Sequence, residues 1–106
     1  MIIVYGLKNC DSCKKALAFL GKDTKFVDIR KEGLDTFSKN KLIESFGENL
    51  INRKSRTWRE LTSNERNKSV SDLMSDHPTV IKRPVIFSQE QIYIGWSQDI
   101  GKKLKS

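Results

Sequence analysis

Long hydrophobic runs are absent from this chain of 106 residues. The apolar runs fall far short of the roughly 20 residues that a membrane-spanning helix needs. Met1 leads directly into the first predicted strand, and no positively charged segment followed by an apolar stretch precedes it, so we expect no signal peptide. The sequence therefore predicts a cytoplasmic protein without membrane association.

Cysteine, histidine and proline are scarce, with two, one and two residues respectively. A structural zinc site takes four ligands, and beyond the two cysteines only His77 is available, so we predict no metal site. In the reducing cytoplasm, a Cys-x-x-Cys pair is catalytic or sensory more often than structural. No repeat, low-complexity tract or linker divides the chain, and a single domain over residues 1–106 is predicted.

Basic residues outnumber acidic ones by 20 to 13, which gives a formal net charge of +7. This balance attracts anions such as nucleic acid, an acidic protein face, phosphate, arsenate or the carboxylates of glutathione. Basic residues crowd the segment from Arg53 to Lys68, which is also typical of an ordinary solvated face. Trp58 lies among them without a recognised nucleic-acid motif, so direct nucleic-acid binding is not expected.

Hydrophobic patterning predicts the order of the elements. Residues 2–5 form a β-rich apolar run, a helix begins near Asp11 and ends before Gly21, and residues 25–29 form a second strand that pairs in parallel with the first. Helices fill an insertion over about residues 34–78, extended stretches at 80–81, 85–87 and 92–94 predict a β-hairpin, and a last helix begins near Gln98. This βαβ…ββα order predicts an α/β, thioredoxin-like fold with a mixed sheet and a helical insertion.

The most informative motif is Cys10-Asp11-Ser12-Cys13, placed where the first strand gives way to the first helix. A helix N-terminus directs unpaired N–H groups at a sulfur there and favours the reactive thiolate form. We interpret Cys10 as a nucleophile and Cys13, one turn deeper on the same helical face, as a resolving thiol. The alternative is a half-exposed Cys10 beside an inert, buried Cys13.

Arg83 and Pro84 open the first strand of the predicted hairpin. In thioredoxin-like folds a cis proline faces the cysteine loop, whereas by residue type alone a trans proline at a strand edge is the commoner outcome. A cis Pro84 would bring Arg83 close to Cys10, where a guanidinium binds an oxyanion or stabilises a thiolate. The alternative for Arg83 is a solvated basic residue.

Seven short motifs, spaced from end to end of the chain, resemble the arsenate reductase ArsC/Spx family and in particular its YffB-like branch. They are YGLKNCD from residue 5, KKA from residue 14, TWREL from residue 57, RNK from residue 66, HP from residue 77, IKRP from residue 81 and GWS from residue 95. The resemblance implies a thioredoxin-like fold with a helical insert, a cytoplasmic location, a catalytic Cys10 and an anion-binding Arg83. Asn9 and Pro84 belong to the same candidate substrate site.

The departures from the family pattern concern its arginines. Arsenate-reducing members place three arginines around the cysteine. The second position falls on Lys54, with Arg53 beside it, and the segment after the last strand has no arginine for the third. Because lysine lacks the bidentate fork that suits a tetrahedral oxyanion, arsenate reduction is not the expected activity.

Two functions follow from the resemblance. The first is a thiol-disulfide oxidoreductase that acts on a small thiol or oxyanion substrate, holds no bound cofactor and takes electrons from glutathione or thioredoxin. The second is an Spx-like regulator that binds the RNA polymerase alpha subunit through a Cys10/Cys13 redox switch. YffB-like members often lack the second cysteine, so Cys13 favours the regulator.

Overall fold

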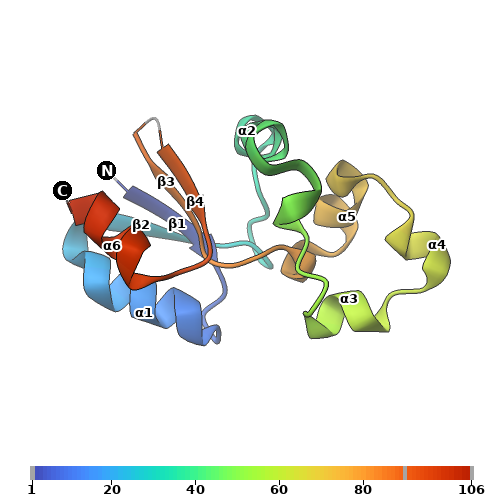
Figure 1. Cartoon of the computed structure of the whole chain (residues 1–106), viewed down its shortest axis with the longest axis horizontal. Helices are drawn as coiled ribbons and strands as arrows, with labels where there is room; N and C mark the ends of the chain where they lie inside the picture. Colours follow the sequence, from blue (N-terminus) through green and yellow to red (C-terminus); the bar gives the residue numbers. More distant parts are fainter. Residues whose placement is uncertain (1, 90, 106) are drawn as a thin grey trace. The chain divides into compact units, whose positions relative to one another are not determined.

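A computed structural model describes residues 2–89 and 91–105, and the chain falls into two compact units (Figure 1). Unit 1 holds the described residues up to Glu32 and those from Arg83 onward, and unit 2 holds Gly33–Lys82. None of the helices in the described residues combines the length and the apolar character needed to span a bilayer. The single-domain organisation stays a prediction.

Unit 1 is a four-stranded mixed sheet with two helices, α1 and α6 (Figure 1). Its elements are β1 (Ile2–Gly6), α1 (Asp11–Leu20), the short 3-10 helix η1 (Gly21–Asp23), β2 (Thr24–Asp28), β3 (Val85–Ser88), β4 (Gln91–Ile94) and α6 (Gln98–Lys105). The strand order is β2-β1-β3-β4, with β1 and β2 parallel and the other pairs antiparallel. The predicted βαβ…ββα order and mixed sheet are thereby confirmed. Glu90, in the predicted hairpin turn, lies outside the described residues.

The core of unit 1 is built on one row of side chains that crosses the sheet. Val4 of β1 is paired with Phe26 of β2 and with Ile86 of β3, so all three point to the same face. Ala16 and Leu20 of α1 pack on that row, and burying each large apolar side chain contributes about 1.5–3 kcal/mol. The partly buried side chains around this cluster are Ile2, Leu17, Phe26, Tyr93, Trp96, Ile100 and Leu104. Helices α1 and α6 therefore cover the same face of the sheet.

Unit 2 consists of short helices whose starts are set by side-chain caps. The helices are α2 (Thr36–Phe46), the 3-10 helix η2 (Gly47–Leu50), α3 (Arg56–Glu60), α4 (Ser63–Arg66), α5 (Val70–Asp76) and the 3-10 helix η3 (Pro78–Val80). The side chains that accept a hydrogen bond from the first turns of α2, α3, α4 and α5 are those of Asp35, Ser55, Thr62 and Ser69. Such caps satisfy backbone N–H groups that a helix start leaves unpaired, which explains why the segment divides into several short helices.

One local expectation in unit 2 is wrong. Val80, predicted as extended, closes a 3-10 turn because its N–H donates to the His77 carbonyl at 2.9 Å; Ile81 follows in an isolated bridge with Ile51. The helical insertion includes α2 as expected, although Phe37 within it is 69% exposed. The buried residues of α2 are Ser38 and Leu42, which places the buried face one position away from Phe37.

Candidate active site

Cys10 occupies the N-cap of α1, directly after the loop that leaves β1. Its backbone is extended (φ −92°, ψ 120°), its N–H donates to the Leu7 carbonyl at 3.3 Å, and its own carbonyl accepts from Lys14 N–H at 3.0 Å. The backbone therefore holds Cys10 at the mouth of the helix while its side chain makes no capping hydrogen bond. The thiol is half-buried, so a reaction partner can reach it.

Cys13 lies in a different environment, one turn deeper in α1 and completely buried. Burial is the main reason why its pKa rises to about 12, and a hydrogen bond that its S–H donates to Cys10 raises the pKa further. The Leu7 backbone N–H and the Arg83 charge act in the opposite direction and lower it. Cys13 is thus a neutral thiol at physiological pH, and Cys10 is the accessible sulfur of the pair.

Gly6, the last residue of β1, makes room for the buried sulfur. A Cβ at this position would overlap Cys13 Sγ and would lie 3.3 Å from Cys13 Cβ. The glycine is required by this close approach, because only a residue without a side chain lets the sulfur lie against the strand. The end of β1 and the first turn of α1 therefore form one packed unit around Cys13.

Cys10 opens into a cavity of about 650 Å³ within unit 1. The lining residues are Leu7, Lys8, Asn9, Cys10, Asp11, Asp28, Arg30, Lys31 and Arg83. Four cationic side chains and two carboxylates give the lining a formal charge of +2. The Asp28 carboxylate, moreover, accepts the backbone N–H groups of Arg30 at 2.9 Å and Lys31 at 3.3 Å, so part of its acceptor capacity is used within its own turn. The cavity suits a small anionic partner.

The topology explains why these residues meet. β1 and β2 are parallel with Gly6 opposite Asp28, so the segments that follow both strands emerge at the same edge of the sheet. Val85 of β3 is opposite Tyr5, which places Arg83 and Pro84 at that edge as well. Ligands of open α/β sheets commonly bind outside the carboxyl ends of the parallel strands.

Sequence reasoning missed the residues that β2 contributes to this cavity. Asp28 lies near the end of the second predicted strand, and Arg30 and Lys31 follow that strand. The signal for all three is the parallel pairing, since parallel strands end at one edge of a sheet. Lys8, which lies in the loop before Cys10, also lines the cavity.

The predicted binding residues of unit 1 lie around the cysteine loop. Arg83 and Asn9 line the cavity with Cys10, whereas Pro84 is buried and its carbonyl accepts from Gly95 N–H at 2.8 Å. The Arg83–Pro84 peptide bond is cis, which is the geometry that the fold context favoured over the trans alternative.

Arg53 and Lys54 belong to unit 2, before α3. The Arg53 guanidinium lies 5.5 Å from the centre of the Trp58 ring, and the Lys54 N–H donates to the Asn52 side-chain oxygen at 3.1 Å. Their role beside Cys10 stays a prediction. Within residues 2–89 and 91–105, no three side chains of His, Cys, Asp or Glu gather as metal ligands would.

The cysteine loop, the parallel β1–β2 pair and the hairpin with its arginine and cis proline agree with a known family. The model of the ArsC family matches residues 5–103 of this chain. The chain belongs to the ArsC family. The predicted resemblance and the α/β, thioredoxin-like fold are thereby confirmed.

Individual relatives extend over nearly the whole chain. It is 37% identical over 106 residues to an uncharacterised protein of Haemophilus influenzae, covering 92% of this chain and 93% of the relative. It is 30% identical to the global transcriptional regulator Spx of Streptococcus pyogenes, covering 93% of this chain and 81% of Spx. Among solved structures, the protein named YFFB superimposes with a TM-score of 0.87 at 26% identity, covering 100% of both chains. This ArsC-family chain is thus similar both to Spx proteins and to YffB.

Proposed function

We propose that this ArsC-family protein is a cytoplasmic thiol-disulfide oxidoreductase with Cys10 as its nucleophile. One observation carries the proposal: a half-exposed thiol at a helix N-cap opens into a cationic cavity while its Cys-x-x-Cys partner is buried and neutral. Helix N-termini and neighbouring cations stabilise thiolate, which is the attacking form of cysteine. The family supports redox chemistry at this position.

The first step is attack of the Cys10 thiolate on one sulfur of a disulfide R–S–S–R′. A bond forms between Cys10 and the R sulfur, the S–S bond breaks, and the R′ thiolate leaves and takes a proton from solvent. When R is glutathione, a second glutathione thiolate attacks the glutathione sulfur of the mixed disulfide. Oxidised glutathione forms, and Cys10 is released as thiolate.

A second route uses Cys13 as the resolving thiol. After losing its proton, Cys13 would attack Cys10 Sγ, release the R thiolate and leave a Cys10–Cys13 disulfide for glutathione or thioredoxin to reduce. The high pKa of the buried Cys13 thiol makes this route slow near neutral pH, because little thiolate is present. Glutathione is accordingly the proposed electron donor.

Turnover of 2-hydroxyethyl disulfide with glutathione, followed as NADPH consumption through glutathione reductase, tests the proposal. Cys10→Ser is expected to reduce the rate to the uncatalysed background, because the nucleophile is removed. Cys13→Ser is the matched control and is expected to keep a glutathione-resolved rate. Equal rates for wild type and Cys10→Ser would rule out an oxidoreductase that uses Cys10 as its nucleophile.

Arg83 is proposed to hold the anionic part of the substrate, with Asn9 beside it and Pro84 shaping the loop. Arg30 and Lys31 extend this cationic lining, and Arg53 and Lys54 of unit 2 remain proposed anion-binding residues. Arg83→Ala should lower the second-order rate constant for forming the Cys10 mixed disulfide from oxidised glutathione about tenfold, and that from the uncharged 2-hydroxyethyl disulfide by no more than about twofold. The measurement is a single turnover of reduced protein without free glutathione. A fall of equal size for both disulfides would contradict an anion-binding role.

A second candidate is a redox-sensing regulator that binds the RNA polymerase alpha subunit. The similarity to Spx and the presence of Cys13 favour it. In this alternative, oxidation of the Cys10/Cys13 pair changes a protein contact and turnover plays no part. A pull-down with purified alpha subunit, with and without oxidant, separates the two candidates: absence of binding in both redox states would rule out the regulator.

A further inference from the structure

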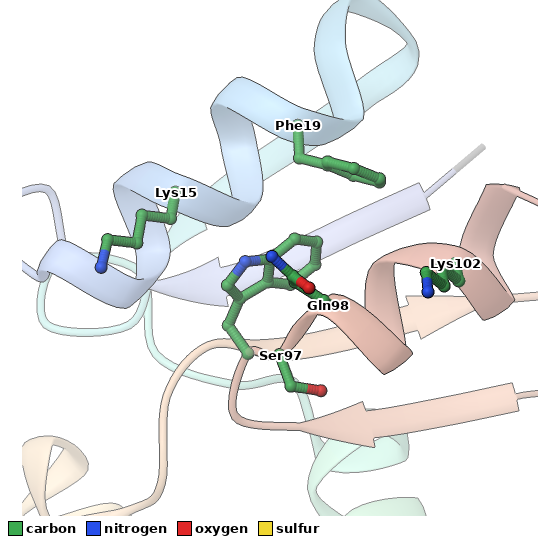
Figure 2. A pocket seen from close by; sticks show the side chains of 6 residues that line it. Lys15, Phe19, Ser97, Gln98 and Lys102 are labelled. Atoms are coloured by element: carbon green, nitrogen blue, oxygen red, sulfur yellow. The ribbon is translucent and has the colours of Figure 1, made fainter.

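A second groove of unit 1 lies between α1 and α6 and shares no lining residue with the Cys10 cavity. It has a volume of about 550 Å³ and is lined by Lys15, Phe19, Trp96, Ser97, Gln98 and Lys102. Figure 2 shows Lys15 and Phe19 on α1 facing the groove opposite Gln98 and Lys102 of α6. Each pair is four residues apart, so both helices present one continuous stripe of side chains to the groove.

The floor of the groove is aromatic and partly open to solvent. The Phe19 ring is 44% exposed and lies 5.4 Å, centre to centre, from the half-buried Trp96 ring at an interplanar angle of 60°. Gly101, a buried glycine inside α6, permits this approach, because a Cβ there would meet Phe19 at 3.0 Å and Trp96 at 3.2 Å. Glycine inside a helix costs about 1 kcal/mol relative to alanine, so its presence fits a packing requirement set by the two rings.

The rim of the groove is positively charged. Lys15 and Lys102 lie on opposite sides of the view in Figure 2, and the Lys105 ammonium is 5.2 Å from the centre of the Phe19 ring. Among the described residues, the lining contains no carboxylate. The two acidic side chains of these helices, Asp11 and Asp99, lie outside it. An aromatic floor between lysines complements a ligand with an apolar centre and negative ends.

We propose that this groove docks a segment of a partner protein in which a bulky apolar side chain is flanked by carboxylates. Aromatic rings are the residues on which interface binding energy concentrates, and here they supply the apolar contact. The lysines pair with the flanking carboxylates and set the orientation of the segment. The groove is independent of the thiol chemistry, so the site acts whichever redox function Cys10 performs.

Trp96 itself reports binding. The chain has two tryptophans, so Trp58→Phe leaves Trp96 as the sole indole. The probe is an acetylated, amidated synthetic peptide with two central leucines flanked on each side by two glutamates. Titration is expected to change the Trp96 emission and to saturate below about 2 mM, the weak range of a short flexible peptide that loses freedom on binding.

Charge reversal on the rim gives the matched comparison. Lys15→Glu with Lys102→Glu should weaken the peptide at least about tenfold, because both carboxylate partners become repulsive. Lys22→Glu with Lys25→Glu, an equal total charge change at two exposed positions outside the groove, should stay within about twofold. Replacing the leucines of the peptide by serines should abolish saturation.

Three results would overturn the proposal. The first is no saturable change in Trp96 emission up to about 5 mM peptide, which is above the expected range. The second is undiminished binding of the peptide to the Lys15→Glu/Lys102→Glu variant, or of the serine-containing peptide to the unreversed protein. Either result would mean that the peptide is attracted diffusely to a basic protein and not held in the groove. The third is tighter binding of a single-stranded oligothymidylate in the same titration, which would identify the groove as a nucleic-acid surface.

Discussion

The two sulfur atoms of the Cys-x-x-Cys motif lie in opposite environments although they share one helix. Cys10 is half-buried at the N-cap, and Cys13 is fully buried against Gly6. The proposed mechanism uses this difference, because the accessible sulfur would attack the disulfide while the buried thiol stays protonated. The sequence predicts Cys10 as the nucleophile and Cys13 as a resolving thiol, with a buried, inert Cys13 as the alternative. Gly6 makes room for the buried sulfur, and the spacing of the cysteines alone does not show that β1 approaches so closely.

At the residue scale, Cys13 should be unreactive in the folded protein. In a Cys10→Ser variant, iodoacetamide at pH 8 is expected to leave Cys13 unmodified for hours and to modify it within minutes in denaturant. Burial is the main cause of its raised pKa and persists in this variant. Mass spectrometry of the intact chain measures the modification. Rapid modification of the folded variant at pH 8 would show that Cys13 is neither shielded nor neutral.

The raised pKa of Cys13 also predicts how the stability of the fold changes with pH. Its folded pKa of about 12 exceeds the reference value of 9.0, so the unfolded chain loses this proton first. The contribution of the neutral thiol is complete below pH 9.0 and is lost as pH rises toward about 12. Urea denaturation of wild type and Cys13→Ala at pH 8 and pH 10.5 should show a smaller alkaline loss in the variant. An identical loss in both proteins would contradict this linkage.

At the element scale, the packing of α1 against β1 depends on Gly6. Gly6→Ala is expected to destabilise the fold by about 1–3 kcal/mol, because the new methyl group overlaps Cys13 Sγ. The double variant Gly6→Ala/Cys13→Ala should recover most of the lost stability, since the sulfur atom that the new methyl group overlaps is absent. Urea denaturation of the wild type, both single variants and the double variant measures the coupling. Additive losses would mean that the two positions do not share this contact.

The capping box of α4 makes a second prediction at this scale. The pKa of Glu65 is lowered by the Thr62 backbone N–H first, and by the Thr62 hydroxyl and His77 further. Because the pKa is lowered in the folded state, the Glu65 carboxylate stabilises the fold at pH values above its reference pKa of 4.5. This stabilisation is lost as the pH falls through the folded pKa. Glu65→Gln should therefore be less stable than wild type at pH 7, and the difference should narrow at pH 3.5. A difference that grows at low pH would have the wrong sign.

Elements with strong periodicity were predictable, and local turns were not. The strands and helices of unit 1 follow from apolar runs and cap residues, because these patterns reflect burial on one face. The extended conformation predicted for Val80 is wrong, because its turn depends on one backbone hydrogen bond to His77. Such a bond cannot be recognised from the hydrophobic pattern. The contribution of β2 to the cavity was readable in principle, since Asp28 ends a strand parallel to the one that carries the cysteine loop.

At the scale of the whole molecule, the net charge of +7 should make recognition of anionic substrates salt-dependent. Raising the salt concentration from about 0.05 M to about 0.5 M is expected to lower the rate constant for forming the Cys10 mixed disulfide from oxidised glutathione several-fold, because screening shortens the range of the attraction. The same rate constant with 2-hydroxyethyl disulfide, which carries no charge, serves as the control and should hardly change. An equal salt dependence for both disulfides would indicate that salt changes the conformation of the protein and does not act by screening its charge.

The two units raise different questions about function. The Cys10 cavity and the aromatic groove are both lined by residues of unit 1, whereas the basic segment around Arg53 belongs to unit 2. An enzyme needs the first unit to bind a small disulfide, and a regulator needs a surface that a large partner recognises. The similarity to Spx and to YffB is consistent with either use of this family's fold.

The most direct measurement is the site of the mixed disulfide. Reduced protein is exposed briefly to oxidised glutathione, trapped with acid, digested and mapped by mass spectrometry. The account predicts glutathione on Cys10 and none on Cys13. Glutathione on Cys13, or no adduct on Cys10 under conditions that modify a free cysteine peptide, would contradict it.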